Sequence, residues 1–257
     1  EEHDGVISCC RQYLEGNEIR FERTSVGATE NAMLAAVKAR GITKIYNAAK
    51  EPEIEDLQNF LNAMGAKIKG AGTDYIEIEG VDKLDKVEYS VIPDRIAIGT
   101  YMVASAMTGG RLEVEKAIRA HMEPISNVLT NAGCNINYTE SGLILIPPKK
   151  IKTIDFLKTS PHPGFPTDMQ SQLMSLMTLS DGITIFFETI FENRFMHCKE
   201  LIKMGADIKL LTDKICMVSG VESLCGGKVK STDLRGGASL VLAALAAEGE
   251  TEISDIY

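Results

Sequence analysis

The chain has 257 residues, of which 44% are hydrophobic and 25% are charged, a composition that suits one large or two smaller globular domains. Its formal net charge of −9 argues against a nucleic-acid or membrane-surface partner, because phosphate groups bind to basic faces. The longest apolar run, residues 240–247, is too short for a membrane span, which needs about 18 residues.

Four segments begin with polar residues, continue as strongly apolar helices and end in glycine, and a short strand follows each of them. The helices are predicted at residues 27–41, 94–110, 167–182 and 232–249, and the strands at residues 42–48, 111–117, 183–189 and 251–257. A further strand is predicted at residues 86–92.

Three amphipathic helix ends, which start at Leu61, Leu129 and Leu201, share a second pattern. Each is followed by a glycine at the position where a left-handed residue ends a helix, and then by a strand. These glycines are Gly65, Gly133 and Gly205. The pattern recurs about every 70 residues, which indicates a repeated supersecondary unit. We therefore predict an α/β fold of repeated helix-strand-helix-strand-strand modules.

The first helix of each module is apolar on nearly every side, which is typical of a buried helix. We expect helices inside and sheets outside, an inside-out α/β barrel. The polar start of each buried helix then presents free N–H groups and the positive end of its dipole to anions. A domain boundary is predicted near Ile92 and Pro93.

The stretch PHPGFPTDMQ, residues 161–170, places three prolines and a glycine just before a helix. Thr167 and Gln170 fit a capping box, which predicts that Asp168 lies in the first turn with a free carboxylate. Asp168 could merely complement the helix dipole. Asp94 and Asp233 occupy the same place in their own modules, however, and a fixed carboxylate can accept a proton from a substrate hydroxyl.

Arginines lie near the same helix starts. Arg194 is predicted between a strand and a helix, and Arg235 follows Asp233 by two positions. Each could be a solvated surface charge or an ion-pair partner, but together they suit a phosphate or carboxylate substrate. At another helix start, Ser25 is a candidate N-cap and Gly27 would allow a ligand to approach the backbone.

Cysteines and histidines show no metal-ligand spacing, and no C-x-x-C pair or dinucleotide or P-loop motif is present. We therefore expect no metal and no cofactor, and buried, reduced thiols in a cytoplasmic protein. The cysteines are Cys9, Cys10, Cys134, Cys198, Cys216 and Cys225.

Six stretches in order, RTSVGATENAM, AAKEPEIEDLQNFLNAMGAKIKGAGTD, IPDRIAIGTYMVASAMTGG, HPGFPTDMQSQ, ETIFENRFMH and TDLRGGASLVLAALAAEG, resemble the UDP-N-acetylglucosamine 1-carboxyvinyltransferases of the enolpyruvyl transferase family. The resemblance implies two inside-out α/β barrels with the active site in the cleft between them. It also implies transfer of enolpyruvyl from phosphoenolpyruvate to the 3′-hydroxyl of UDP-N-acetylglucosamine, by addition and then elimination of phosphate, in peptidoglycan precursor synthesis.

The resemblance carries site residues with it. Asp168 matches the family's proposed base, and Arg194 and Arg235 match arginines of the cleft. Asp233 stands in the same motif as Arg235 and completes the candidate catalytic set. The remaining matches are to substrate-binding positions: Arg23, Ser25, Val26, Gly27, Ile190 and Phe191. Arg23 stands where many members have Lys, which keeps the charge but changes its geometry.

Other family motifs are missing, namely a Lys-Asn pair, a loop with a proton-donating cysteine and a final arginine. We therefore expect a fragment that is inactive alone, in which residues 1–92 are the C-terminal part of the catalytic first domain and residues 93–257 are most of the second. Two alternatives stay open: the sister enzyme that acts on shikimate 3-phosphate, and a non-catalytic paralogue that binds sugar nucleotides.

Overall fold

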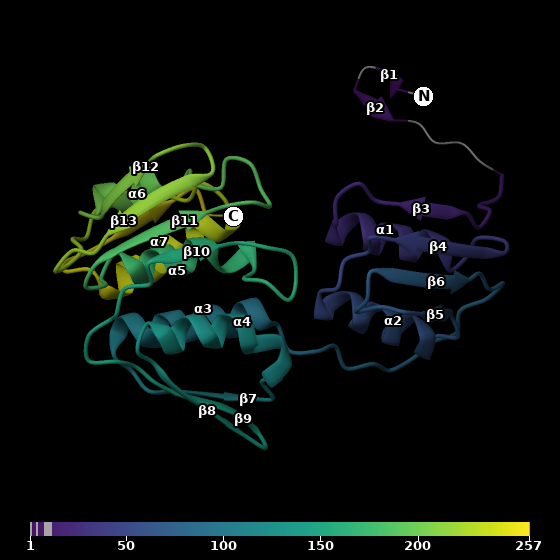
Figure 1. Ribbon diagram of the computed structural model, residues 1–257, viewed down its shortest axis with the longest axis horizontal. Helices are drawn as coiled ribbons and strands as arrows, with labels where there is room; N and C mark the ends of the chain where they lie inside the picture. The colour runs from purple at the N-terminus through teal and green to yellow at the C-terminus, as the bar shows by residue number, and fades with distance from the viewer. Residues whose placement is uncertain (1, 4, 8–11, 257) are drawn as a thin grey trace. The chain divides into compact units, whose positions relative to one another are not determined.

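The computed structural model describes residues 2–3, 5–7 and 12–256, and the chain divides into two compact units, residues 1–92 and 93–257 (Figure 1). The division falls between Ile92 and Pro93, where the sequence suggests a boundary. The strand predicted at residues 86–92 is wrong, since this segment has no regular secondary structure. Its Tyr89 is held by side chains of a helix instead: the hydroxyl donates to Asp56 at 2.7 Å and the ring packs on Phe60.

The first unit is one complete module with a mixed sheet. Its strand order is β3-β4-β6-β5, with β3 parallel to β4 and the other pairs antiparallel. Its core includes fully buried Met33, Ile45, Ile54 and Ile76. The elements are β1 (Glu2–His3), β2 (Val6–Ile7), β3 (Glu18–Arg20), α1 (Val26–Ala36), β4 (Ile42–Tyr46), α2 (Pro52–Ala63), β5 (Lys67–Lys69) and β6 (Tyr75–Glu79).

The second unit holds three sheets with strand orders β7-β9-β8, β10-β11-β13-β12 and β14-β15. Its elements are α3 (Arg95–Thr108), β7 (Leu112–Glu115), α4 (Arg119–Asn131), β8 (Asn135–Thr139), β9 (Gly142–Ile146), β10 (Phe156–Lys158), the 3₁₀ turn η1 (Thr167–Met169), α5 (Gln170–Met177), β11 (Ile183–Phe187), α6 (Cys198–Lys203), β12 (Asp207–Leu210), β13 (Ile215–Ser219), β14 (Lys228–Lys230), α7 (Leu234–Ala246) and β15 (Glu252–Ser254).

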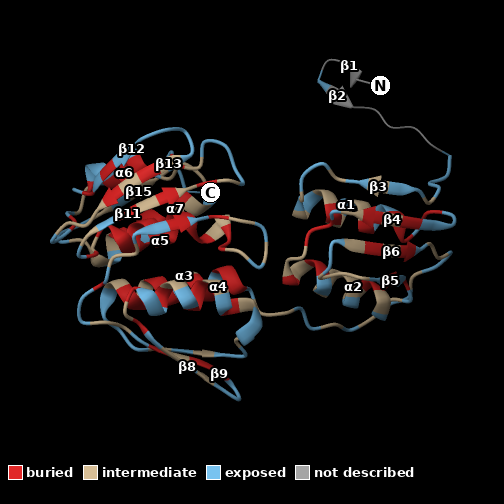
Figure 2. Cartoon of the chain, in the orientation of Figure 1, coloured by how far each residue is buried: buried red, intermediate tan, exposed pale blue. Residues whose placement is uncertain are grey.

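The predicted inside-out arrangement is present in the second unit. Helices α3, α5 and α7 contact one another, and every residue of α5 is buried (Figure 2). The sheets lie around these helices and contribute their inner faces to the same core, through residues such as Leu145, Phe186 and Val218. The N-termini of the central helices are thereby available to carry a site.

The module contains one strand more than the sequence predicts. In each of the two four-stranded sheets, a short strand precedes the first helix and pairs in parallel with the strand that follows it; β14 and β15 repeat this pairing. The additional strands β3, β10 and β14 have three residues each. Three residues are too few for the alternation of apolar and polar side chains that identifies a strand in a sequence.

The three predicted helix ends are confirmed. Gly65, Gly133 and Gly205 have φ of 100°, 101° and 93°, in the left-handed region that glycine adopts without steric cost. In each case the next residue's N–H donates to a carbonyl five residues back, as in Ala66 to Leu61 at 3.0 Å. This is the Schellman arrangement, and it leads each helix directly into a strand.

Cysteine burial differs in part from the expectation. Cys134, Cys198 and Cys216 are buried free thiols, but Cys225 is exposed, so that prediction is wrong for this residue. Cys225 follows buried Leu224 and forms an isolated parallel bridge with Glu248, which leaves its side chain exposed. Cys9 and Cys10 lie outside the described residues.

Two further properties concern the ranges 2–3, 5–7 and 12–256 alone. Every helix there is too short or too polar to cross a lipid bilayer. No three His, Cys, Asp or Glu side chains there come together in a way that could hold a metal ion.

Candidate active site

Asp168 lies in the 3₁₀ turn η1, which the proline-rich loop leads into. The loop closes on itself, because Ser160 N–H donates to the Phe165 carbonyl at 3.0 Å and Gly164 N–H donates to the Pro161 carbonyl at 2.8 Å. The predicted capping box is wrong. The Thr167 hydroxyl does not cap α5 but donates to buried Glu188 at 3.0 Å.

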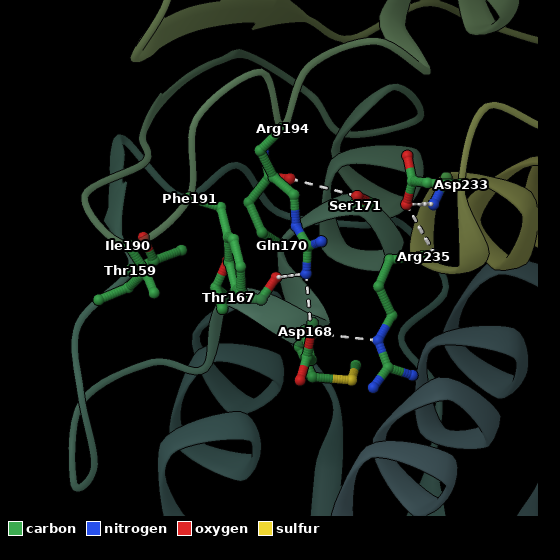
Figure 3. Close-up of polar contacts among 12 residues, drawn as sticks. Thr159, Thr167, Asp168, Gln170, Ser171, Ile190, Phe191, Arg194, Asp233 and Arg235 are labelled. Carbon is green, nitrogen blue, oxygen red and sulfur yellow. Dashed lines mark hydrogen bonds and ion pairs between the residues drawn. The ribbon is translucent and has the colours of Figure 1, made fainter. Parts of the chain in front are cut away.

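Two arginines converge on one oxygen of Asp168 (Figure 3). Arg194 Nη2 lies 2.7 Å from Oδ1, and Arg235 Nε lies 3.2 Å from the same atom. The predicted free carboxylate is therefore wrong for this oxygen. The Asp168 side chain remains 40% exposed, against 13% for Arg194. The carboxylate is thus both paired with arginines and accessible to a ligand.

Arg194 is fixed from several sides. Its Nη2 also donates to the Thr167 carbonyl at 3.2 Å, and its guanidinium carbon lies 5.0 Å from the centre of the Phe191 ring. Within the described residues, its buried Nε has no hydrogen-bond partner. Since a planar guanidinium held in this way loses little freedom on binding, it is ready to meet a charged ligand.

Asp233 is the N-cap of α7. Its Oδ1 accepts the N–H groups of Arg235 and Gly236 at 2.9 and 3.0 Å, and its Oδ2 accepts the Thr232 hydroxyl. Burial raises the pKa of Asp233, but these hydrogen bonds and the charge of Arg194 outweigh burial and lower the pKa below its usual value. Asp233 is thus an ionised cap that holds Arg235 in the first turn.

The three aspartates are not equivalent, although the sequence suggests it. Asp94 caps α3 as Asp233 caps α7, by accepting two N–H groups from the first turn. Asp168 accepts no backbone N–H there and contacts the two arginines instead. Among the ion pairs of the described residues, Asp168 is the one of the three aspartates whose carboxylate pairs with guanidinium groups.

Glu188 is a residue of this site that the sequence interpretation missed. Its side chain is fully buried and accepts hydrogen bonds from Thr159, Thr167 and the backbone at residues 190 and 191. One signal was present: Thr184, Phe186 and Glu188 alternate along β11 and its continuation, so that a carboxylate falls on the inner face of the sheet.

Ile190 and Phe191 follow directly and are large exposed apolar side chains, 41% and 51% exposed. Figure 3 shows both on the loop that carries Arg194. Further along this loop, His197 is fully buried, and burial lowers its pKa to about 4, against the opposing influence of the Asp233 charge. A neutral imidazole is thus buried close enough to Arg194 and Asp233 to be influenced by their charges.

The remaining predicted residues belong to the first unit. Ser25 is the N-cap of α1, as predicted, and its hydroxyl accepts the N–H of Ala28 at 3.3 Å. Val26 and Gly27 begin the helix, and a side chain at Gly27 would meet no atom of the described residues within 4 Å. Arg23 is exposed and forms no ion pair with another described residue.

Comparisons with known proteins identify the family. The family model described as EPSP synthase (3-phosphoshikimate 1-carboxyvinyltransferase) matches residues 2–257. The chain belongs to this family. Its members are carboxyvinyl transferases, so the resemblance and the fold class expected from the sequence are confirmed.

Two relatives share a name within this family. A UDP-N-acetylglucosamine 1-carboxyvinyltransferase 1 from Caldanaerobacter subterraneus is 54% identical over 98% of this chain, and a UDP-N-acetylglucosamine 1-carboxyvinyltransferase from Myxococcus xanthus is 46% identical over 99%. The chain spans 60% of the length of each of these relatives.

Solved structures of the family agree in fold. The enolpyruvyl transferase NikO from Streptomyces tendae is similar with a TM-score of 0.84 at 25% identity, over 95% of this chain and 61% of that protein. An EPSP synthase from Acinetobacter baumannii gives a TM-score of 0.69 at 22% identity, over 94% and 59% respectively, and at this identity it supports the fold alone.

Proposed function

We propose that the protein containing this chain transfers the enolpyruvyl group of phosphoenolpyruvate to the 3′-hydroxyl of UDP-N-acetylglucosamine and releases phosphate. The observation that carries the proposal is the convergence of Arg194 and Arg235 on Asp168, in a chain 46–54% identical to proteins named for this activity. The reaction is a step of peptidoglycan precursor synthesis, which we place in the cytoplasm.

Asp168 is suited to the role of general base. Its Oδ1 is held by two guanidinium groups, which fixes the orientation of the carboxylate and leaves Oδ2 for the substrate hydroxyl. The sugar oxygen forms a bond with C2 of phosphoenolpyruvate as its proton passes to Asp168, and C3 gains a proton from another group. Loss of phosphate from C2 and of a proton from C3 then restores the double bond.

The arginines are suited to anionic groups of the substrates. Phosphoenolpyruvate carries a phosphate and a carboxylate, and planar guanidinium groups bind both in a bidentate manner. Arg235 lies in the first turn of α7, where the helix dipole adds to its positive charge. We assign to Asp233 the positioning of Arg235, since both of its carboxylate oxygens already accept hydrogen bonds.

The other predicted residues take substrate-binding roles in this proposal. Ser25, Val26 and Gly27, at the start of α1, bind the UDP part together with Arg23, while Ile190 and Phe191 contact the substrate through apolar side chains. Residues 1–92 form the C-terminal part of the catalytic first domain, and residues 93–257 form most of the second. The chain spans 60% of the length of its relatives, so the activity is proposed for the complete protein.

The shikimate enzyme is the alternative of the same chemistry. The family model bears its name, but the solved EPSP synthases are only 22% identical to this chain. A non-catalytic sugar-nucleotide-binding paralogue is the alternative of another class. The paired Asp168 and Arg194 favour catalysis over that alternative, since binding alone needs no base.

The test is phosphate release from phosphoenolpyruvate by the complete protein, at the length of its relatives, with each acceptor in turn. We expect release that depends on UDP-N-acetylglucosamine and falls by about 10²-fold or more in Asp168→Ala. Release only with shikimate 3-phosphate would assign the protein to the sister enzyme. Binding of UDP-N-acetylglucosamine without release would support the non-catalytic paralogue.

A further inference from the structure

Glu188 places a carboxyl group in the core, at a position where an apolar side chain would be expected. It follows β11, and its backbone N–H continues the sheet by donating to the Lys214 carbonyl at 2.9 Å. The side chain therefore points inward, on the same face as Phe186, and is fully buried. Burying an ionised carboxylate costs several kcal/mol unless hydrogen bonds compensate it, so such a residue usually has a specific role.

The compensation comes from four hydrogen bonds to two different segments. Oε1 accepts the Thr159 hydroxyl at 2.8 Å and the N–H groups of Ile190 and Phe191 at 2.8 and 3.1 Å. Oε2 accepts the Thr167 hydroxyl at 3.0 Å. The carboxylate thus joins the segment of residues 159–167, which it binds through both oxygens, to the loop before Arg194, which it binds through Oε1.

These two segments carry the charged pair of the site. Thr167 immediately precedes Asp168, and its carbonyl also accepts Arg194 Nη2 at 3.2 Å. Phe191 lies three residues before Arg194, and its ring faces the guanidinium. The distance of 2.7 Å between Arg194 and Asp168 therefore depends on two segments that meet at Glu188.

We propose that Glu188 is a positioning residue of this site, which holds the segment of Asp168 and the loop of Arg194 in register without touching the substrate. The kinetic consequence of this assignment rests on the proposed function. A displacement of about 1 Å between catalytic groups costs about 10²-fold in rate, so a positioning residue affects turnover more than substrate binding.

The first test measures turnover of the complete protein in two variants of Glu188 and in one control variant. Glu188→Ala should lower kcat by about 10²-fold, with KM changed by less than about threefold. Glu188→Gln keeps the shape and can bond to the same partners, since Thr167 can accept as well as donate, so it should recover most of kcat.

The matched control is Glu200→Ala. Glu200 is also a buried carboxylate that joins two segments, since it accepts Lys230 N–H at 2.9 Å and Lys203 Nζ at 2.7 Å. It contacts neither Thr167 nor the loop at residues 189–194, so kcat should stay within about threefold of wild type. An equal loss of kcat in folded Glu188→Ala and Glu200→Ala would overturn the proposal, as would wild-type kcat in Glu188→Ala.

The second test needs no activity and is hydrogen exchange on this chain. Glu188→Ala should increase exchange at the amides of Ile190 and Phe191 by more than about tenfold, while Glu200→Ala should do so at Lys230. If the complete wild-type protein released no phosphate, the proposed function would fail, and the exchange result would then decide the role of Glu188. Unchanged exchange at residues 190 and 191 would overturn it.

Discussion

Asp168 differs from an ordinary surface carboxylate in how its two oxygens are used. Both arginines bind Oδ1, and the side chain nevertheless remains 40% exposed. The two arginines are more buried, at 13% and 27% exposure, so the charges are held in place while one face of the carboxylate stays open to solvent. This arrangement suits the proposed function, in which the arginines bind anionic groups and the carboxylate accepts a proton from a hydroxyl.

His197 gives the site a dependence on pH that can be measured as stability. Its folded pKa of about 4 lies below the usual value of 6.5, because burial disfavours the charged ring. Between pH 6.5 and 4 the unfolded chain therefore binds a proton that the folded chain does not. Above pH 6.5, His197 does not lower the free energy of unfolding. Between pH 6.5 and pH 4, each unit of decrease in pH lowers the free energy of unfolding by up to about 1.4 kcal/mol.

Urea unfolding of the chain at pH 7, 6 and 5, followed by circular dichroism, tests this prediction. Replacement of the imidazole in His197→Gln removes the titrating group, so the variant should lose less stability than wild type between pH 6 and pH 5. The difference in slope isolates His197 from the other titrating groups. Parallel pH profiles for the two proteins would contradict the burial of a neutral ring at this position.

At the scale of single residues, the sequence indicated three charged side chains of the candidate site, but it missed Glu188 and did not show what the side chains contact. Asp168, Arg194 and Arg235 were found because they stand near helix starts. The partner of Thr167 could not be found, because a local capping pattern cannot show that Glu188, 21 residues away, competes for the hydroxyl. Non-local contacts of this kind decide site geometry.

At the scale of elements, helices α3 and α7 begin with the same type of N-cap but differ in their relation to the candidate site. Asp94 and Asp233 each accept two N–H groups of the first turn, so replacing either by Ala should lower the unfolding free energy by about 1 kcal/mol. Only α7 carries Arg235 toward Asp168. We therefore expect kcat/KM of the complete protein to fall by at least about tenfold in Asp233→Ala and to change little in Asp94→Ala.

Denaturant unfolding and steady-state kinetics of the two variants separate these effects. Similar losses of stability with unequal kinetics would assign to Asp233 the positioning of Arg235. Unaltered kinetics in Asp233→Ala, with the stability loss present, would show that Arg235 keeps its place without the cap, and the assignment would be withdrawn.

The repeated elements were predictable to different degrees. Long apolar helices and glycine-terminated helix ends appear directly in the sequence, because their signals are local. The strands β3, β10 and β14 do not, because each has three residues and is defined by parallel pairing with a strand beyond the next helix. Residues 86–92 were mistaken for a strand because a strand also needs a partner strand, and the local sequence does not show whether one is present.

At the scale of the whole chain, the two units have separate hydrophobic cores. The cluster around Ile45 uses residues 19–84, whereas the cluster around Leu240 uses residues 96–253. The second unit contains all four of the residues that meet at the candidate site, namely Asp168, Glu188, Arg194 and Arg235. The geometry of this site is therefore supported by the second core, while Ser25 and its neighbours depend on the first.

This separation predicts that a cavity in one core destabilises one unit. Ile45 and Leu240 are both fully buried, and truncation of such side chains costs about 2–5 kcal/mol. In hydrogen exchange of the chain, Ile45→Ala should reduce protection in residues 12–92 and leave residues 93–256 near wild type, and Leu240→Ala should do the reverse. The amides of Ile190 and Phe191 should follow the second variant only. Loss of protection in both units from either substitution would show that the chain unfolds as one cooperative body, and the two cores would then have to be treated as one.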